Sequence, residues 1–331
     1  MALDASTLHT LTKGTDAEAW GAIVTRALDI ACKPLTAGNT PSEIVRRDRA
    51  IGDLDLFLSS TGWDLWQSFG SSVERTSQRL LRWWAQLFSA KAILILDGLS
   101  PRELPWLLQG ANQHGFTTHE VAACASELPG NTDEFARALG FASRSKLQNN
   151  GAGSAHKLQP AHTETVDLPW KECEALIDST PNQIFWHHWP DAKLHDESEA
   201  GKGLEPLTQE VARQLASDDF WAFVERLATG RQLVITSDHG YAATGYFPDA
   251  DGEAAQFLKA TFASKRSKSG MEGTVAPFVP PVALPITNHH NDAHLMALGR
   301  RKWKSQGGYP TLAHGGLSLL EVLSPWVEIS K

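Results

Sequence analysis

The stretch Ala92-Ile93-Leu94-Ile95-Leu96-Asp97 decides the fold class of this chain, and Leu233-Val234-Ile235-Thr236-Ser237-Asp238 repeats its pattern. Short apolar runs that are rich in β-branched residues and closed by polar ones are typical of buried parallel strands. A third run, Gln183-Ile184-Phe185-Trp186, comes shortly before Asp191. Ligands of an open α/β sheet gather beyond the carboxyl ends of its strands. We therefore expect the three aspartates to meet at one edge of a sheet.

Strand and helix patterns alternate from residue 91 onward, which predicts an α/β fold with a mostly parallel sheet flanked by helices. Residues 1–88 read as a helical amino-terminal region, and residues 89–331 as a second domain. The polar, proline-containing segment at about 241–308 reads as an insertion in that domain. Individual expectations are helices over 16–30, from 41, and over 71–87, 104–114, 132–139 and 207–227, with further strands over 118–125 and 326–329.

Composition restricts the class of protein. The chain has 331 residues, three widely spaced cysteines and a net charge of −8. The cysteines favour a reducing cytoplasm over a disulfide framework or a cysteine-rich zinc site. The sequence shows no export signal and no run of the roughly 18 apolar residues that a bilayer span needs. We expect a cytoplasmic protein without a membrane partner, whose acidic surface disfavours nonspecific nucleic-acid binding except at a local basic patch.

Side chains with metal-ligand chemistry follow the predicted strands. Asp191 and His195 form a D-x-x-x-H pair that one helical turn would place on one face. Asp238 is followed by His239, and His314 precedes two glycines. Oxygen and nitrogen ligands suit zinc first, with manganese as the alternative. We assign one divalent ion to Asp191, His195 and His314, and a second to Asp97, Asp238, His239 and the hydroxyl of Thr132.

Each of these residues also has an ordinary structural explanation. Aspartate at a strand end is commonly a turn former or a helix cap. Thr132 could be only a first-turn residue, because Asn131 and Glu134 would satisfy a capping arrangement there. A single histidine such as His314 is often structural. The joint pattern, rather than any one residue, favours a two-metal site.

The chain resembles the PglZ family, a branch of the alkaline phosphatase superfamily, over roughly residues 90–331. The resemblance rests on the segments 94–98, 128–132, 184–191, 235–240 and 314–321, of which S-D-H-G at 237–240 and H-G-G at 314–316 are the most specific. It implies an alkaline-phosphatase-like two-metal hydrolase fold, found in phage-defence systems of the BREX type. Two segments depart from the family pattern. Pro129-Gly130-Asn131-Thr132 replaces P-S-x-T, and Ser100 stands where D-x-x-R would place arginine, with Arg102 two residues later.

We interpret the chain as a metal-dependent phosphodiesterase, with a nuclease included in that class, that uses Thr132 as nucleophile in phage defence. A phosphomonoesterase of the same superfamily is one alternative. The other is a low-activity scaffold subunit that binds further phage-defence proteins, with the amino-terminal helices as its docking surface. A sulfatase is disfavoured because C-x-P-S-R and S-x-P-S-R are absent.

Basic runs provide the candidate contacts to a phosphate-ester substrate or to nucleic acid. Lys265, Arg266 and Lys268 form one run, and residues 300–304 form another with an interleaved tryptophan. Such side chains could follow phosphates and stack a base, although solvated charge is the simpler explanation. The candidate substrate-binding residues are Arg102, Asn131, Arg300, Arg301 and Trp303.

Overall fold

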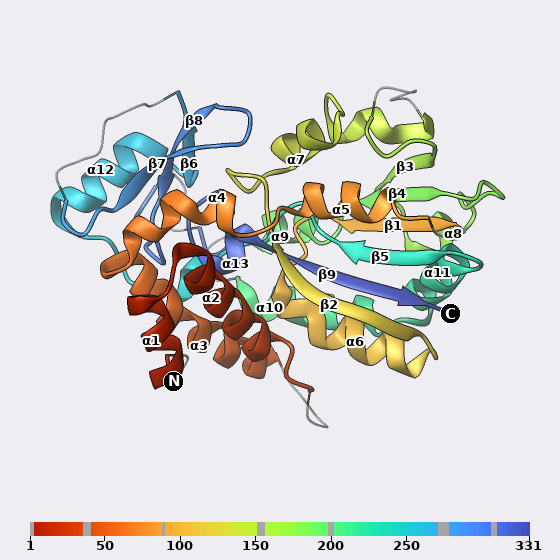
Figure 1. The fold of residues 1–331 in the computed structure, drawn as a ribbon, viewed down its shortest axis with the longest axis horizontal. Helices are drawn as coiled ribbons and strands as arrows, with labels where there is room; N and C mark the ends of the chain where they lie inside the picture. Colours follow the sequence, from red (N-terminus) through yellow and green to blue (C-terminus); the bar gives the residue numbers. More distant parts are fainter. Residues whose placement is uncertain are drawn as a thin grey trace.

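A mixed six-stranded sheet forms the centre of the computed structural model, which describes residues 3–35, 41–87, 90–150, 156–197, 202–270, 278–305 and 310–331 (Figure 1). The strand order is β2-β9-β5-β1-β4-β3. Strand β9 pairs antiparallel with β2 and β5, and the other pairings among these strands are parallel. The predicted α/β class with a mostly parallel sheet is therefore confirmed. The strands are β1 (Lys91–Leu96), β2 (Thr117–Ala125), β3 (His162–Val166), β4 (Gln183–His187), β5 (Gln232–Thr236) and β9 (Leu323–Ser330).

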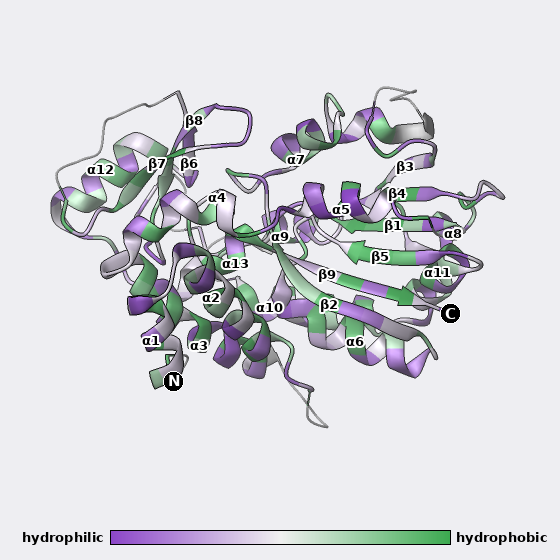
Figure 2. Cartoon of the chain, in the orientation of Figure 1, coloured by the Kyte–Doolittle hydropathy of each residue, from purple (hydrophilic) through white to green (hydrophobic). Residues whose placement is uncertain are grey.

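Helices cover both faces of this sheet because its central strands are apolar on both sides. In β1, Leu94 and Leu96 join one buried cluster, whereas Ile93 and Ile95 join another. The first cluster includes side chains of α6 (Leu104–Gln113), α10 (Leu204–Leu215) and α11 (Asp218–Ala228). The second includes side chains of α5 (Thr76–Trp84) and α7 (Thr132–Leu139). Figure 2 shows the apolar character of β1 and β5 between these layers.

The amino-terminal region is helical, as predicted. It contains α1 (Ala5–Lys13), α2 (Asp16–Ala31), α3 (Pro41–Ser60), the 3-10 helix η1 (Trp63–Ser68) and α4 (Phe69–Ser72) before α5. The single helix predicted over 71–87 was wrong, because Val73 is extended and separates α4 from α5. The helix predicted over 207–227 is likewise two helices. The first ends at Leu215, and Ser217 caps the second by accepting a hydrogen bond from the backbone N–H of Phe220.

A small antiparallel sheet lies within the segment that we predicted as an insertion. Its strands β6 (Ser267–Ser269), β7 (Ala283–Thr287) and β8 (Ala293–Ala297) are arranged in the order β6-β8-β7, and α12 (Gly252–Phe262) precedes them. Leu284 and Met296 of this sheet share a buried cluster with Trp20 and Ile51 of the amino-terminal helices. The insertion and the helical region therefore pack together.

Shorter elements complete the part of the chain that the structure describes. They are η2 (Pro101–Glu103), η3 (Arg144–Asn150), α8 (Trp170–Glu174), α9 (Asp191–Glu197), η4 (Thr244–Tyr246) and α13 (Leu319–Val322). Within the described ranges, no helix has the length and apolar character to cross a bilayer.

Candidate metal centre

The three predicted aspartates lie beyond three adjacent parallel strands, β5, β1 and β4. Asp97 follows β1 directly, Asp238 follows β5 by two residues, and Asp191 is the first residue of α9 after β4. The backbone N–H of Asp191 donates to the carbonyl of Asp97 at 2.9 Å. Gly98 has φ +73°, and a Cβ at this position would lie 3.2 Å from Cβ of Asp191. The strand exits thus approach closely enough to bring their carboxylates together.

Asp97, Asp238 and His239 form one group of potential metal ligands, all of them buried. Nε2 of His239 lies 3.6 Å from an oxygen of each carboxylate. Thr132 donates its hydroxyl to Asp238 at 2.9 Å and also lies 3.3 Å from Asp97. This threonine is the first residue of α7, whose cap is Asn131. Helix capping and contact with the ligands are therefore compatible, because Asn131 caps α7 while the Thr132 hydroxyl contacts the two carboxylates.

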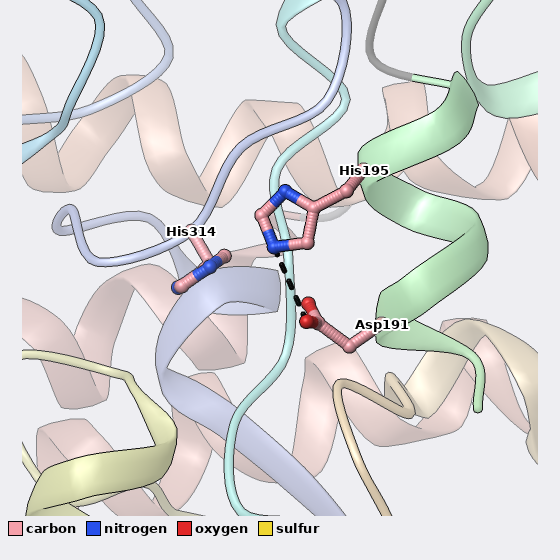
Figure 3. A group of neighbouring side chains, drawn as sticks. All are labelled: Asp191, His195 and His314. Carbon is pink, nitrogen blue, oxygen red and sulfur yellow. Dashed lines mark ion pairs between the residues drawn. The ribbon is translucent and has the colours of Figure 1, made fainter. Parts of the chain in front are cut away.

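Asp191, His195 and His314 form the second group (Figure 3). One turn of α9 brings Nε2 of His195 to 3.2 Å from Oδ2 of Asp191. His314 comes from the loop before α13, and its ring stacks on that of His239 with 4.3 Å between the ring centroids. The two groups are therefore adjacent, with the ring of His239 from one group against the ring of His314 from the other.

Hydrogen bonds to the backbone orient the two stacked histidines. Nδ1 of His239 donates to the carbonyl of Gly240, and Nδ1 of His314 donates to the carbonyl of Gly130, each at 2.9 Å. This leaves Nε2 of each ring as the nitrogen that can bind an ion, which is the usual arrangement of histidine ligands. Nε2 of His239 and Oδ1 of Asp191 are buried without a hydrogen-bond partner.

The carboxylates make this region short of positive charge. Burial raises the pKa of Asp97 well above its usual range, and the charges of Asp238 and Asp191 add to the effect. Burial also acts to raise the pKa of Asp191, but the hydrogen bond from His195 and the charges of the other histidines outweigh it and lower that pKa. Burial lowers the pKa of His314 to about 4, so its imidazole is neutral at physiological pH. A bound cation would compensate the crowded carboxylates.

The donor set fits two divalent ions. One group supplies two carboxylates, one imidazole and a hydroxyl, and the other supplies one carboxylate and two imidazoles. Oxygen and nitrogen donors of this kind suit zinc and manganese. The structure thus brings the predicted ligands together in the two groups to which the sequence assigned them.

A third group, Glu134, Asp292 and His294, is already satisfied by other side chains. The amide of Asn288 contacts both Glu134 and Nε2 of His294 at 3.2 Å, and Arg137 pairs with Asp292. Since these partners occupy the atoms that an ion would need, we assign no metal to this group.

Most predicted substrate contacts are engaged elsewhere. Arg102 is buried and pairs with Asp48 at 2.6 Å, and Arg300 pairs with the same aspartate at 2.9 Å. Trp303 is buried beside Phe262. These three side chains stabilise the interior, so the structure contradicts the expectation that they reach substrate. Asn131 caps α7, and Arg301 is half-buried with no hydrogen-bond partner for its Nε.

Arg144 lies at the site although the sequence pattern did not reveal it. Its Nε is 3.8 Å from Oδ2 of Asp97, and its buried Nη1 has no hydrogen-bond partner. It belongs to η3, which follows α7, and no motif spacing marks it. Its position becomes visible only when α7 and η3 fold back over the sheet.

The comparisons with known proteins add no identification. A scan of protein-family models found no matching family, and a search of curated proteins found no similar sequence. The resemblance to PglZ proteins therefore rests on the motifs quoted above and stays a prediction.

Proposed function

We propose that this protein is a two-metal-dependent phosphoric ester hydrolase, and that Thr132 is its nucleophile. The observation that carries the proposal is the position of the Thr132 hydroxyl, which contacts Asp97 and Asp238 of one ligand group. The second group lies across the stacked rings of His239 and His314. A hydroxyl held by one ligand group, with a second ligand group adjacent, supports phosphoryl transfer through a covalent intermediate.

The two ligand groups would hold one ion each. When bound, these ions would offset the negative charge of the phosphate and of the departing oxygen. In the first step, Oγ1 of Thr132 gives up its proton and forms a bond to phosphorus, while the bond from phosphorus to the leaving oxygen breaks. The proton released from Thr132 passes through solvent to the departing alkoxide. Water then hydrolyses the phosphothreonine and restores the hydroxyl.

Residues around Thr132 support this role. The hydrogen bond to Asp238 fixes the direction of the hydroxyl, and its place at the start of α7 turns free backbone N–H groups toward the phosphate. Arg144 offers a guanidinium beside Asp97 for the remaining phosphate oxygens. We infer that it fills the role of the arginine that the family pattern places after the first strand.

A phosphodiester is our first proposal for the substrate. A phosphomonoesterase would use the same residues. A role in phage defence, together with other defence proteins, follows from the family resemblance alone. The scaffold alternative makes no use of the two ligand groups, whereas the hydrolase proposal uses both.

The test is hydrolysis of chromogenic phosphate esters by protein loaded with zinc or manganese. We expect a p-nitrophenyl phosphodiester to be hydrolysed faster than p-nitrophenyl phosphate, and chelation to abolish both activities. Faster hydrolysis of the monoester would replace the diesterase proposal with a monoesterase. Folded, metal-filled protein that hydrolyses neither ester would favour the scaffold function.

A further inference from the structure

A cavity of about 280 Å³ lies beside the loop that carries Thr132. Its walls come from three parts of the chain that are distant in sequence. The amino-terminal helices contribute Trp66 to Ser71 and Arg75, the loop after β2 contributes Ser126 and Leu128, and the end of β7 contributes residues 286–289.

The loop between β2 and α7 contributes Ser126 and Leu128 to the cavity and Gly130 to the surroundings of the candidate metal centre. Gly130 follows Leu128 by two positions, and its carbonyl accepts the hydrogen bond of His314. A Cβ at Gly130 would lie 3.4 Å from Cβ of His239 and 3.9 Å from Cβ of Ser126. On the other side, Asn288 lines the cavity and donates to Glu134 in the first turn of α7, the turn that begins with Thr132. The loop after β2 and the contact of Asn288 with Glu134 therefore connect the cavity to the first turn of α7, which begins with the proposed nucleophile.

The lining combines apolar and polar side chains. Trp66, Phe69 and Leu128 are buried members of one core cluster. Hydroxyl and amide groups of Ser71, Thr287 and other residues supply both donors and acceptors around them. Small-molecule sites combine apolar surface with polar groups that fix the orientation of the ligand.

Charge in the cavity is balanced. Nε of Arg75 lies 3.1 Å from Oε2 of Glu127, a fully buried carboxylate that also lies 2.9 Å from Nδ1 of His289. Oε2 of Glu127 and Nε2 of His289 make no well-aligned hydrogen bond. Glu127 therefore offsets the positive charge of Arg75 at the cavity wall, whereas the metal centre once loaded would attract an anion.

We propose that this cavity binds an uncharged, nucleoside-sized part of the substrate, attached to the phosphate that Thr132 attacks. The inference rests on the proposed hydrolase function and narrows its substrate class. A volume of about 280 Å³ is near the lower end of ligand pockets, which suits one base and sugar rather than a strand. A phosphate bearing a nucleoside on one side and a second group on the other is a diester.

Two substitutions that fill the cavity test the proposal. Gly70 lines it, and a Cβ there would have no atom within 4 Å, so Gly70→Trp can extend a ring into the space without a clash at its base. Thr287→Trp would fill the cavity from the opposite wall. Gly21→Trp is the matched control, because Gly21 on α2 is equally open and does not line this cavity.

Binding of the four common nucleoside 5′-monophosphates and of inorganic phosphate would be measured by calorimetry with metal-loaded protein. We expect at least one nucleotide to bind, with its affinity lowered at least about tenfold in Gly70→Trp and Thr287→Trp and within about twofold of wild type in Gly21→Trp. Inorganic phosphate should bind all four proteins alike.

Absence of binding by all four nucleotides, or affinity that neither cavity-filling variant lowers, would overturn the proposal. Equal loss of nucleotide and phosphate binding would also overturn it, because the cavity would then have no role of its own. Nucleotide binding that shows the expected losses without hydrolysis of any ester would instead refute the hydrolase function and leave the cavity assignment in place.

Discussion

The guanidinium of Arg144 lies beside Asp97, with its Nε 3.8 Å from Oδ2 of that aspartate. Its Nη1 is buried without a hydrogen-bond partner. Loss of a charged hydrogen bond to phosphate costs about 1.5–3 kcal/mol. Arg144→Ala should therefore lower kcat/KM for a chromogenic ester roughly ten- to hundredfold while the metal content stays unchanged. Arg137→Ala, on the half-exposed side of α7, is the control and should have little effect. Full activity in Arg144→Ala would show that this arginine does not contact substrate.

Ionisation of the Asp97 carboxylate is unfavourable in the metal-free protein, and a bound cation would offset this cost. Its pKa is raised by burial and by the nearby carboxylates of Asp238 and Asp191. Asp97→Asn keeps the shape and removes that charge, so the metal-free protein should gain on the order of 1 kcal/mol of stability. The same variant should bind one divalent ion fewer than wild type. Urea unfolding of metal-free protein and metal analysis by mass spectrometry would check both effects, and an unchanged metal content would exclude Asp97 as a ligand.

At the scale of elements, a buried ionic network joins α3 to the rest of the molecule. Asp48 pairs with Arg102 beyond β1 and with Arg300 beyond β8, and Asp55 pairs with Arg300 at 2.6 Å and accepts the backbone N–H of Leu319 at 2.7 Å. The helical region is thus fixed to the loops that surround the candidate site. These buried contacts make the helical region part of the same folded unit, which disfavours its interpretation as a separate docking surface.

Removing one member of this network should be costly. Asp48→Asn leaves two buried arginines with fewer partners, and breaking a buried pair costs about 3–5 kcal/mol. Glu74→Gln, which removes an exposed pair with Arg82, should cost about 1 kcal/mol or less. Chemical denaturation of both variants would give the comparison. A cost for Asp48→Asn as small as that of the surface control would mean that α3 is held by apolar packing alone.

Strands and ligand spacings were predictable from the sequence because their signals are local. An apolar run such as 92–96, followed by polar residues, predicts a strand and also the sheet edge at which the ligands after it lie. The D-x-x-x-H spacing predicts a ligand pair from a single turn of helix. Local signals of this kind predicted the sheet and the two ligand groups. The breaks at Val73 and Ser217 were missed because apolar spacing continues across them. Arg102 and Arg300 were misassigned because their partners on α3 lie far away in the sequence.

At the scale of the whole molecule, the basic runs do not form a continuous surface. Arg266 and Arg300 pair with buried carboxylates, and Trp303 is buried, which leaves Lys265, Lys268 and Lys304 as exposed members of the two runs. With a net charge of −8, such a surface offers few contacts to a phosphate backbone.

Nucleic-acid strands should therefore bind weakly. We expect the affinity for a single-stranded oligonucleotide to change little between about 50 and 200 mM salt, because few counterions are released. Fluorescence anisotropy of a labelled oligonucleotide across that range would measure the slope. A steep fall in affinity with salt would instead indicate a strand-binding surface and favour a nuclease over an enzyme of small diesters.

The most direct measurement of the central claim compares Thr132→Ala and Thr132→Ser with wild type in the hydrolysis of a chromogenic phosphodiester, with metal content measured on the same samples. Thr132→Ala should lose at least about a thousandfold in kcat, because the nucleophile is gone, while both ions remain bound. Thr132→Ser keeps a hydroxyl and should retain substantial activity. Turnover in Thr132→Ala close to that of wild type, in protein that still binds two ions, would contradict the assignment of Thr132 as the nucleophile.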